Sequence, residues 1–135
     1  MTLKIILASH GELAKGMKNT LNMIVGDQAN IKAYSAYDEE NIDFVSDINK
    51  EIQNRNDEEL IIVTDVMGGS VNNAMTELVL KNPDVFLVTG MNLPFVLSLA
   101  TYCGRVDFEA INNLVIEGRK GLINVNEVIQ TIKEE

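Results

Sequence analysis

Four short apolar runs alternate along the chain with longer stretches in which apolar residues recur every three or four positions. Nearly continuous apolar runs rich in β-branched residues are typical of strands buried on both faces of a parallel sheet. The longer stretches are typical of helices with one buried side. The predicted strands are Leu3–Ala8, Ile31–Ser35, Leu60–Thr64 and Val85–Thr89, of which the second is the least apolar.

The helical spacing predicts a helix after each strand and a second helix after the fourth. The predicted helices are Leu13–Val25, Asp38–Asn54, Val71–Lys81, Pro94–Tyr102, Phe108–Glu117 and one that begins at Asn126. Residues suited to helix ends agree with these ranges. They are Gly26 as a C-cap, Asp38-Glu39-Glu40 as an N-cap with an acidic first turn, Ser70 and Asn126 as N-caps, and Pro94 in a first turn.

The predicted elements follow the order β-α-β-α-β-α-β-α-α-β-α, in which the short apolar stretch Leu122–Val125 is the last strand. Regular alternation, with connections long enough for crossover helices, predicts an α/β fold with a doubly wound, mostly parallel sheet and helices on both faces. We expect a single domain over residues 1–135, because no repeat, linker or low-complexity segment divides the chain.

The composition narrows the classes of partner and the compartment. A formal net charge of -9 argues against nucleic acid and against an anionic membrane surface, and is compatible with a basic protein partner. The single cysteine, Cys103, excludes an intrachain disulfide and provides no metal-binding cluster. No apolar run approaches the roughly 20 residues that span a bilayer. Because Met1-Thr2 leads directly into the first predicted strand, we expect no signal peptide. We therefore expect a cytoplasmic protein.

Three strand ends carry residues suited to binding phosphate. They are Ser9-His10-Gly11, with the only histidine of the chain, Asp65-Val66-Met67-Gly68-Gly69-Ser70, and Gly90-Met91-Asn92. In open α/β sheets these turns lie at the edge where ligands bind, and glycine-rich turns and helix N-termini bind anions. The turns contain no Lys or Arg and the chain has no GxxxxGK[ST] motif, which argues against a nucleoside triphosphate. Asp65 alone provides too few carboxylates for Mg²⁺, so we expect neither a metal nor a cofactor.

The histidine and aspartate are suited to phosphoryl transfer through a histidine. A histidine nucleophile needs one bare ring nitrogen, while an acceptor on the other nitrogen fixes the tautomer. Asp65, at the end of an adjacent strand, is the expected acceptor for His10 and would stabilise positive charge on the ring. The phosphoryl oxygens would be held by Ser70 and by the turns that contain Gly11, Gly68 and Gly69. Each residue also has a purely structural interpretation, in which the glycines shape turns and Asp65 and Ser70 act as caps.

Three segments resemble a known family. SHGELAKGM near the start, TDVMGGSVNNA after the third strand and TGMNLP after the fourth resemble the IIA domain of the mannose-type sugar phosphotransferase system, whose members serve mannose, fructose or sorbose. The resemblance extends over essentially the whole chain, in order and spacing. It implies that His10 corresponds to the phosphorylated histidine, Asp65 to the aspartate that orients it, and Ser70 to the serine of the family motif.

The resemblance also implies partners. His10 would accept phosphate from the carrier protein HPr and pass it to a histidine of a IIB domain, from which it reaches sugar entering through the membrane components IIC and IID. Family members are usually homodimers that exchange a C-terminal edge strand, for which Leu122–Val125 is the candidate. The family turn often reads Gly-Gly-Ser-Pro-Phe-Asn, whereas Val71 and Asn72 follow the serine here. We expect a separate IIA subunit without a IIB domain after it, and the sequence leaves the sugar open.

Other interpretations also fit an α/β fold. The phosphocarrier of a dihydroxyacetone kinase system shares the fold. A receiver domain phosphorylated on Asp65 would use the end of the third strand, but needs an acidic pair where this chain has Ser9-His10. A flavodoxin-like FMN binder would need aromatic residues in turns that have only Phe95 nearby. A serine hydrolase would need a G-x-S-x-G motif, which the turn ending in Ser70 does not match.

Overall fold

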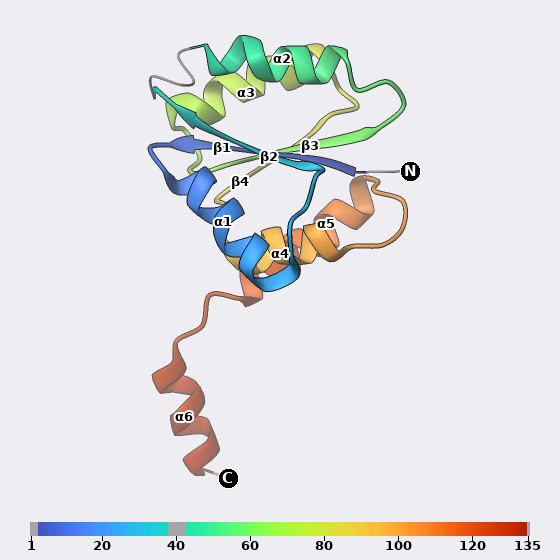
Figure 1. Ribbon diagram of the computed structural model, residues 1–135. Helices are drawn as coiled ribbons and strands as arrows, with labels where there is room; N and C mark the ends of the chain where they lie inside the picture. The colour runs from blue at the N-terminus through green and yellow to red at the C-terminus, as the bar shows by residue number, and fades with distance from the viewer. Residues whose placement is uncertain (1–2, 38–42, 135) are drawn as a thin grey trace.

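The computed structural model describes residues 3–37 and 43–134. The elements are β1 (Leu3–His10), α1 (Leu13–Val25), β2 (Ile31–Ala36), α2 (Phe44–Gln53), β3 (Glu59–Thr64), α3 (Ser70–Lys81), β4 (Phe86–Thr89), α4 (Leu93–Thr101), α5 (Phe108–Lys120) and α6 (Val125–Glu134). One sheet lies between two layers of helices, with α2 and α3 over one face and α1, α4 and α5 over the other (Figure 1). None of the described helices combines the length and the apolar character needed to cross a lipid bilayer.

The four strands are parallel and lie in the order β2-β1-β3-β4, which confirms the predicted doubly wound sheet. The crossover through α1 places β2 on one side of β1. The crossover through α2 returns the chain to the other side, where β3 and then β4 are added. The strand order therefore reverses between β1 and β3, and in open α/β sheets ligands bind beyond the carboxyl ends of the strands at such a point. At this edge β1 ends in His10 and β3 in Thr64.

Alternate side chains of β1 enter two separate hydrophobic cores. Ile5 and Leu7 pack on the side of α1, α4 and α5, whereas Ile6 and Ala8 pack on the side of α2 and α3 (Figure 1). All four side chains are completely buried. This alternation is the period of two expected of a strand with helices on both faces. The two cores hold β1 in place from both sides, and so fix the position of the histidine at its end.

Two of the predicted helix ends are confirmed. Gly26 is the C-cap of α1, with a φ of 82° that favours glycine, and Pro94 lies in the first turn of α4. The N-cap predicted at Asp38-Glu39-Glu40 lies outside the described residues. In the described part of the chain, Asp43 is the N-cap of α2 and its carboxylate accepts a hydrogen bond from the N–H of Ser46 at 3.2 Å.

Two of the predicted N-caps are wrong. α3 begins at Ser70 itself and Gly69 is its N-cap, because the Ser70 hydroxyl has partners outside the helix. α6 begins at Val125, one residue before Asn126. Its first turn is supported instead by Asn124, whose side-chain oxygen accepts a hydrogen bond from the N–H of Asn126 at 3.1 Å.

Leu122–Val125 is not a strand in the single chain, and its role as an edge strand exchanged in a dimer stays a prediction. The chain turns at Gly121, continues without regular structure to Asn124, and enters α6 at Val125. A strand requires the edge of a neighbouring strand to pair with. This segment instead leads away from the sheet, and α6 lies apart from the rest of the chain, beyond the layer of α4 and α5 (Figure 1). Within the described residues, the sheet therefore ends at β4.

Candidate functional site

The three candidate residues lie together at the point where the strand order reverses. His10 is the last residue of β1, Asp65 follows β3 directly, and Ser70 is the first residue of α3. Because β1 and β3 are parallel neighbours with Ala8 opposite Thr64, their ends lie side by side. Residues 55 to 60 positions apart in the sequence are thereby brought within hydrogen-bonding distance.

Asp65 binds the imidazole of His10 through one ring nitrogen. His10 Nδ1 lies 2.7 Å from Asp65 Oδ2, and the backbone N–H of His10 donates to the same oxygen at 2.9 Å. An ionised carboxylate only accepts hydrogen bonds, so Nδ1 carries the ring proton in the neutral imidazole. Nε2 is then the bare nitrogen, which is the state required of a nucleophile.

The environment of Asp65 keeps its carboxylate ionised. Only 10% of its side chain is exposed. Burial alone would raise the pKa of this carboxyl, but hydrogen bonds from the backbone and the ring of His10 outweigh burial and hold the pKa below its ordinary value of 3.8. The other oxygen, Oδ1, accepts a hydrogen bond from the N–H of Val66 at 3.0 Å. Both oxygens are therefore engaged, and the carboxylate is charged at neutral pH.

Ser70 lies on the other side of the ring. Its Oγ is 3.2 Å from His10 Nε2, the nitrogen that Asp65 leaves bare. The first N–H groups of α3 have no carbonyl partner within the helix, because the first bond inside it runs from the N–H of Asn73 to the carbonyl of Gly69 at 2.9 Å. A hydroxyl and the positive end of a helix dipole thus lie beside the bare nitrogen, as binding of an anion there requires.

Glycine residues allow the turns to approach the ring. A Cβ added at Gly69 would lie 3.3 Å from Cε1 of His10 and 3.0 Å from Cγ1 of Val66. Gly11 and Gly68 have φ values of 56° and 80°, a region in which side chains are rarely accommodated. The turn after β3 therefore packs directly against the imidazole, and a larger residue at position 69 would push the ring away.

Tyr37 is a fourth member of the site that the sequence analysis missed. It follows β2, where Ala36 pairs with His10, so it lies next to the histidine across the sheet. Its hydroxyl donates to Ser70 Oγ at 2.6 Å, and its ring centroid is 5.8 Å from that of His10. The signal that could have found Tyr37 is its position at the end of a strand neighbouring β1.

The residues that depart from the usual family turn are buried and secure the start of α3. Val71 is completely buried and Asn72 almost so. The side-chain oxygen of Asn72 accepts a hydrogen bond at 2.8 Å from the hydroxyl of Thr64, which also lies 2.8 Å from the hydroxyl of Thr89. This chain lacks the rigid proline of the usual family turn. Buried hydrogen bonds of Asn72, Thr64 and Thr89 connect the first turn of α3 to the ends of β3 and β4 instead.

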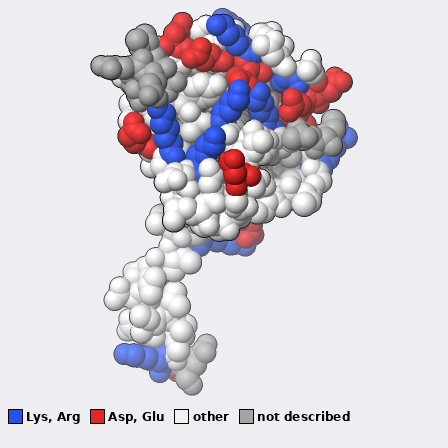
Figure 2. All heavy atoms as spheres, in the orientation of Figure 1, with Lys and Arg blue, Asp and Glu red and all other residues white. Residues whose placement is uncertain are grey.

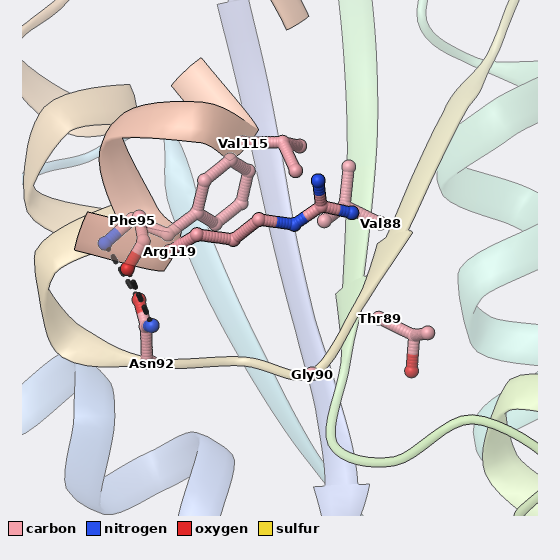
Figure 3. A pocket seen from close by; sticks show the side chains of 8 residues that line it. Val88, Thr89, Gly90, Asn92, Phe95, Val115 and Arg119 are labelled. Atoms are coloured by element: carbon pink, nitrogen blue, oxygen red, sulfur yellow. Dashed lines mark hydrogen bonds between the residues drawn. The ribbon is translucent and has the colours of Figure 1, made fainter. Parts of the chain in front are cut away.

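The third phosphate-binding turn that the sequence predicted has other contacts. Asn92 is the N-cap of α4, accepting from the N–H of Phe95 at 2.8 Å, and its amide donates to the carbonyl of Gly118 at 2.9 Å. These contacts border a small cavity of about 110 Å³, over which the side chain of Arg119 extends beside Val88 (Figure 3). The turn thus joins α4 to α5, and neither of these Asn92 contacts involves His10.

The His10 site is open at the surface. Of the His10 side chain, 45% is exposed. Apolar side chains in the neighbouring segments are exposed as well, namely Leu13 at the start of α1, Val66 and Met67 in the turn after β3, and Tyr37 after β2. We call these four residues the apolar rim. An exposed nucleophile with such a rim is suited to contact with another protein surface.

Comparison with known proteins agrees with this geometry. The family model described as "PTS system fructose IIA component" matches residues 4–116. The sorbose-specific EIIA component of Klebsiella pneumoniae is 32% identical over 95 residues, which cover 70% of each chain. That of Lacticaseibacillus casei is 33% identical over 99 residues, covering 73% of this chain and 72% of the relative.

A solved structure has the same architecture. The PTS IIA protein associated with the fucose utilization operon of Streptococcus pneumoniae superposes with a TM-score of 0.81 at 28% sequence identity. The superposition covers 96% of this chain and 97% of that one. Fold, turns and sequence lead to the same conclusion: the chain belongs to the IIA family of the mannose-type sugar phosphotransferase system.

Proposed function

We propose that the chain is a cytoplasmic phosphohistidine relay subunit. In this proposal His10 accepts a phosphoryl group from HPr and passes it to a histidine of a IIB domain, from which it reaches sugar entering through the membrane components IIC and IID. The observation that carries the proposal is the arrangement of the His10 ring. Nδ1 is bound by an ionised carboxylate whose side chain is only 10% exposed, while the His10 side chain is 45% exposed.

The proposed transfer forms one bond and breaks another. The lone pair of His10 Nε2 attacks phosphorus, and the bond from phosphorus to the carrier group of HPr breaks, with its electron pair going to that group. The ring gains positive charge because Nδ1 keeps its proton. Asp65 Oδ2, 2.7 Å from Nδ1, stabilises this charge. Transfer to the IIB domain reverses these changes, and neither step requires a metal or a cofactor.

The surroundings of His10 support a protein as the immediate donor and acceptor. The ring lies at the exposed carboxyl ends of the strands, among the exposed residues of the apolar rim. A protein surface placed on this rim would exclude water from the reacting atoms, which strengthens the electrostatic contacts on which phosphoryl transfer depends. The phosphoryl oxygens would be bound by Ser70 and by the N–H groups at the start of α3.

Phosphate transfer from phosphoenolpyruvate, with enzyme I and HPr, tests the proposal. We expect one phosphate per chain by intact mass, located on His10 by residue mapping and dependent on HPr. A His10→Ala protein that still accepts phosphate would contradict the proposal. Phosphate on Asp65 would favour a receiver domain. Onward transfer to a IIB domain, and not to a dihydroxyacetone kinase subunit, would separate the proposed function from that of the related phosphocarrier.

We also propose that the chain works as a homodimer whose C-terminal segments cover each other's sheets. None of the residues of α6 is buried, and an isolated helix of ten residues is marginal in water. On the face seen in Figure 2 the part of this segment above its tip is mostly uncharged, although Glu127 lies in the first turn of α6. All four residues of β4 are only half-buried. A second copy would cover both surfaces. The exposed apolar residues of the segment are Leu122, Ile123, Val125, Val128, Ile129 and Ile132.

A further inference from the structure

Tyr37 contacts the site at two points. Its hydroxyl is 2.6 Å from Ser70 Oγ and its ring lies beside that of His10. Of the Tyr37 residue surface, 67% is exposed, so packing into the core does not explain its place. The ring also makes an edge contact with Phe44, at 5.9 Å between centroids.

The directions of the hydrogen bonds follow from the chemistry of each group. Asp65 is ionised and can only accept, so the His10 proton is on Nδ1 and Nε2 is an acceptor. The Ser70 hydroxyl must then donate to Nε2, 3.2 Å away. Because its one hydroxyl proton is directed to Nε2, Ser70 Oγ acts as the acceptor of the hydrogen bond that the Tyr37 hydroxyl donates. The result is a continuous chain of donors from Tyr37 through Ser70 to the reactive nitrogen.

The backbone of Tyr37 is held in an unfavourable conformation. Its φ of 66° lies in the left-handed region, which is uncommon for residues other than Gly, Asn and Asp. Such a conformation persists where other contacts determine it. Among the described residues, Tyr37 makes the Ser70 hydrogen bond and two ring contacts that can determine this conformation, and two of these three involve the site.

We propose that Tyr37 is a positioning residue for phosphoryl transfer, acting through Ser70. This inference rests on the proposed function. The Tyr37 hydroxyl holds Ser70 Oγ as an acceptor and so directs the Ser70 proton toward the ring. When the bond from Nε2 to phosphorus forms and the donor's bond breaks, the Ser70 proton turns from Nε2 to a phosphoryl oxygen. The Tyr37 proton stays on its own oxygen throughout.

Four variants test this role by the rate of HPr-dependent phosphorylation. Tyr37→Phe removes only the hydroxyl and keeps the ring, and we expect transfer to slow by about 2- to 10-fold, the effect of losing one neutral hydrogen bond. Ser70→Ala should also slow transfer, and the double variant should be no slower than Ser70→Ala. The matched control is Tyr102→Phe, which removes a tyrosine hydroxyl that donates to the carbonyl of Arg105 away from the site, and should leave the rate unchanged.

A second readout reports on the ring directly. The nitrogen NMR shift of His10 Nε2 depends on the hydrogen bond that it accepts, so Tyr37→Phe should move this shift in the same direction as Ser70→Ala. An unchanged rate and shift in Tyr37→Phe would overturn the inference, as would a double variant clearly slower than Ser70→Ala. A wild-type protein that takes no phosphate would overturn the proposed function and this inference together. Phosphorylated wild type with an unaffected Tyr37→Phe would overturn the inference alone.

Discussion

One carboxylate oxygen of Asp65 binds His10 at two points, the backbone N–H at 2.9 Å and ring Nδ1 at 2.7 Å. The backbone contact fixes the end of β1 against the turn after β3. The ring contact fixes the tautomer and the orientation of the imidazole. Because both donors belong to the same residue, the position of the backbone and the chemistry of the ring are set by a single oxygen. This relationship makes Asp65 the most informative position to alter.

Asp65→Asn should slow phosphorylation of His10 by about 10- to 100-fold. The amide keeps the size of the side chain but loses the charge that stabilises the ring as it becomes positive, and hydrogen bonds to charged groups contribute about 1.5–3 kcal/mol. The measurement is the initial rate of phosphate transfer from HPr. Asp84→Asn is the control and should leave the rate unchanged. Asp84 lies just before β4, and its carboxylate binds Arg55, which follows α2, so neither residue belongs to the His10 site. An unchanged rate in Asp65→Asn would contradict the role assigned to the charge.

Gly69→Ala should slow transfer about 3- to 30-fold, because misplacing a reacting group by a fraction of an ångström has effects of this order. The φ of Gly69 is -71°, so alanine is compatible with the backbone and the change acts only through the contacts of its Cβ with His10 and Val66. The measurement is the transfer rate together with urea unfolding, in which we expect a loss of about 1 kcal/mol.

Gly16→Ala is the matched control for this glycine substitution. Gly16 lies in α1, and a Cβ there would meet nothing within 4 Å. Alanine at such a position should raise the free energy of unfolding by about 0.5–1 kcal/mol and leave transfer unchanged. Equal transfer rates for both alanine variants would mean that the close approach at position 69 has no part in the chemistry.

The pairing of His10 with Asp65 could be predicted because it depends on topology alone. Two buried parallel strands bring their carboxyl ends to one edge, and the residues that follow them meet there. For Tyr37, topology gives only its neighbourhood, the end of the strand beside β1. Its contact with the site also depends on the register of β2, the least apolar of the predicted strands, and on an unusual φ.

The errors in the sequence analysis have physical causes as well. Serine is a residue type that commonly acts as an N-cap, but the Ser70 hydroxyl is hydrogen-bonded to His10 and Tyr37 and is not used as a cap. Gly69 is the N-cap of α3 instead. Leu122–Val125 is rich in strand-forming residues, but it pairs with none of the strands that the structure describes in the single chain, and its exchange in a dimer stays a prediction. Local propensity predicts which structures a segment can adopt, while tertiary contacts decide among them.

Glu51→Gln should lower the free energy of unfolding by about 1–3 kcal/mol at neutral pH. Glu51, on α2, binds the ammonium groups of Lys4 in β1 and Lys32 in β2, so it attaches the helix to two strands. Urea unfolding of the variant and the wild type provides the measurement. An equal stability at neutral pH would show that the two ion pairs only offset the cost of burying Glu51.

The difference in unfolding free energy between the wild type and Glu51→Gln should depend on pH in a direction that the structure determines. Burial alone would raise the pKa of Glu51, but hydrogen bonds and charge from Lys32 and Lys4 hold the pKa below its ordinary value of 4.5. A carboxyl whose pKa is lowered by folding stabilises the folded state fully above its unfolded pKa. That contribution is lost as the pH falls below 4.5 through the folded pKa. The stability difference between wild type and Glu51→Gln should therefore shrink in acid, and a difference that grew instead would contradict this sign.

If the exposed C-terminal segment forms the dimer contact, one acidic substitution within it should weaken the dimer. Of the Leu122 surface, 89% is exposed in the single chain. Burying a leucine contributes about 1.5–3 kcal/mol, and a symmetric dimer would bury two copies. Leu122→Asp should therefore raise the dimer dissociation constant by at least about 100-fold, measured by sedimentation equilibrium.

Leu80→Asp is the matched control for this prediction. Leu80 is 77% exposed on α3, on the face of the sheet opposite to α4 and α5 (Figure 1), and the same change there should leave the dissociation constant unaltered. Equal weakening by both substitutions would point to a general effect of added charge. A wild-type chain that sediments as a monomer at high concentration would contradict the proposed contact between two copies through the C-terminal segment. The homodimer would then be excluded, while the chemistry at His10 would be unaffected.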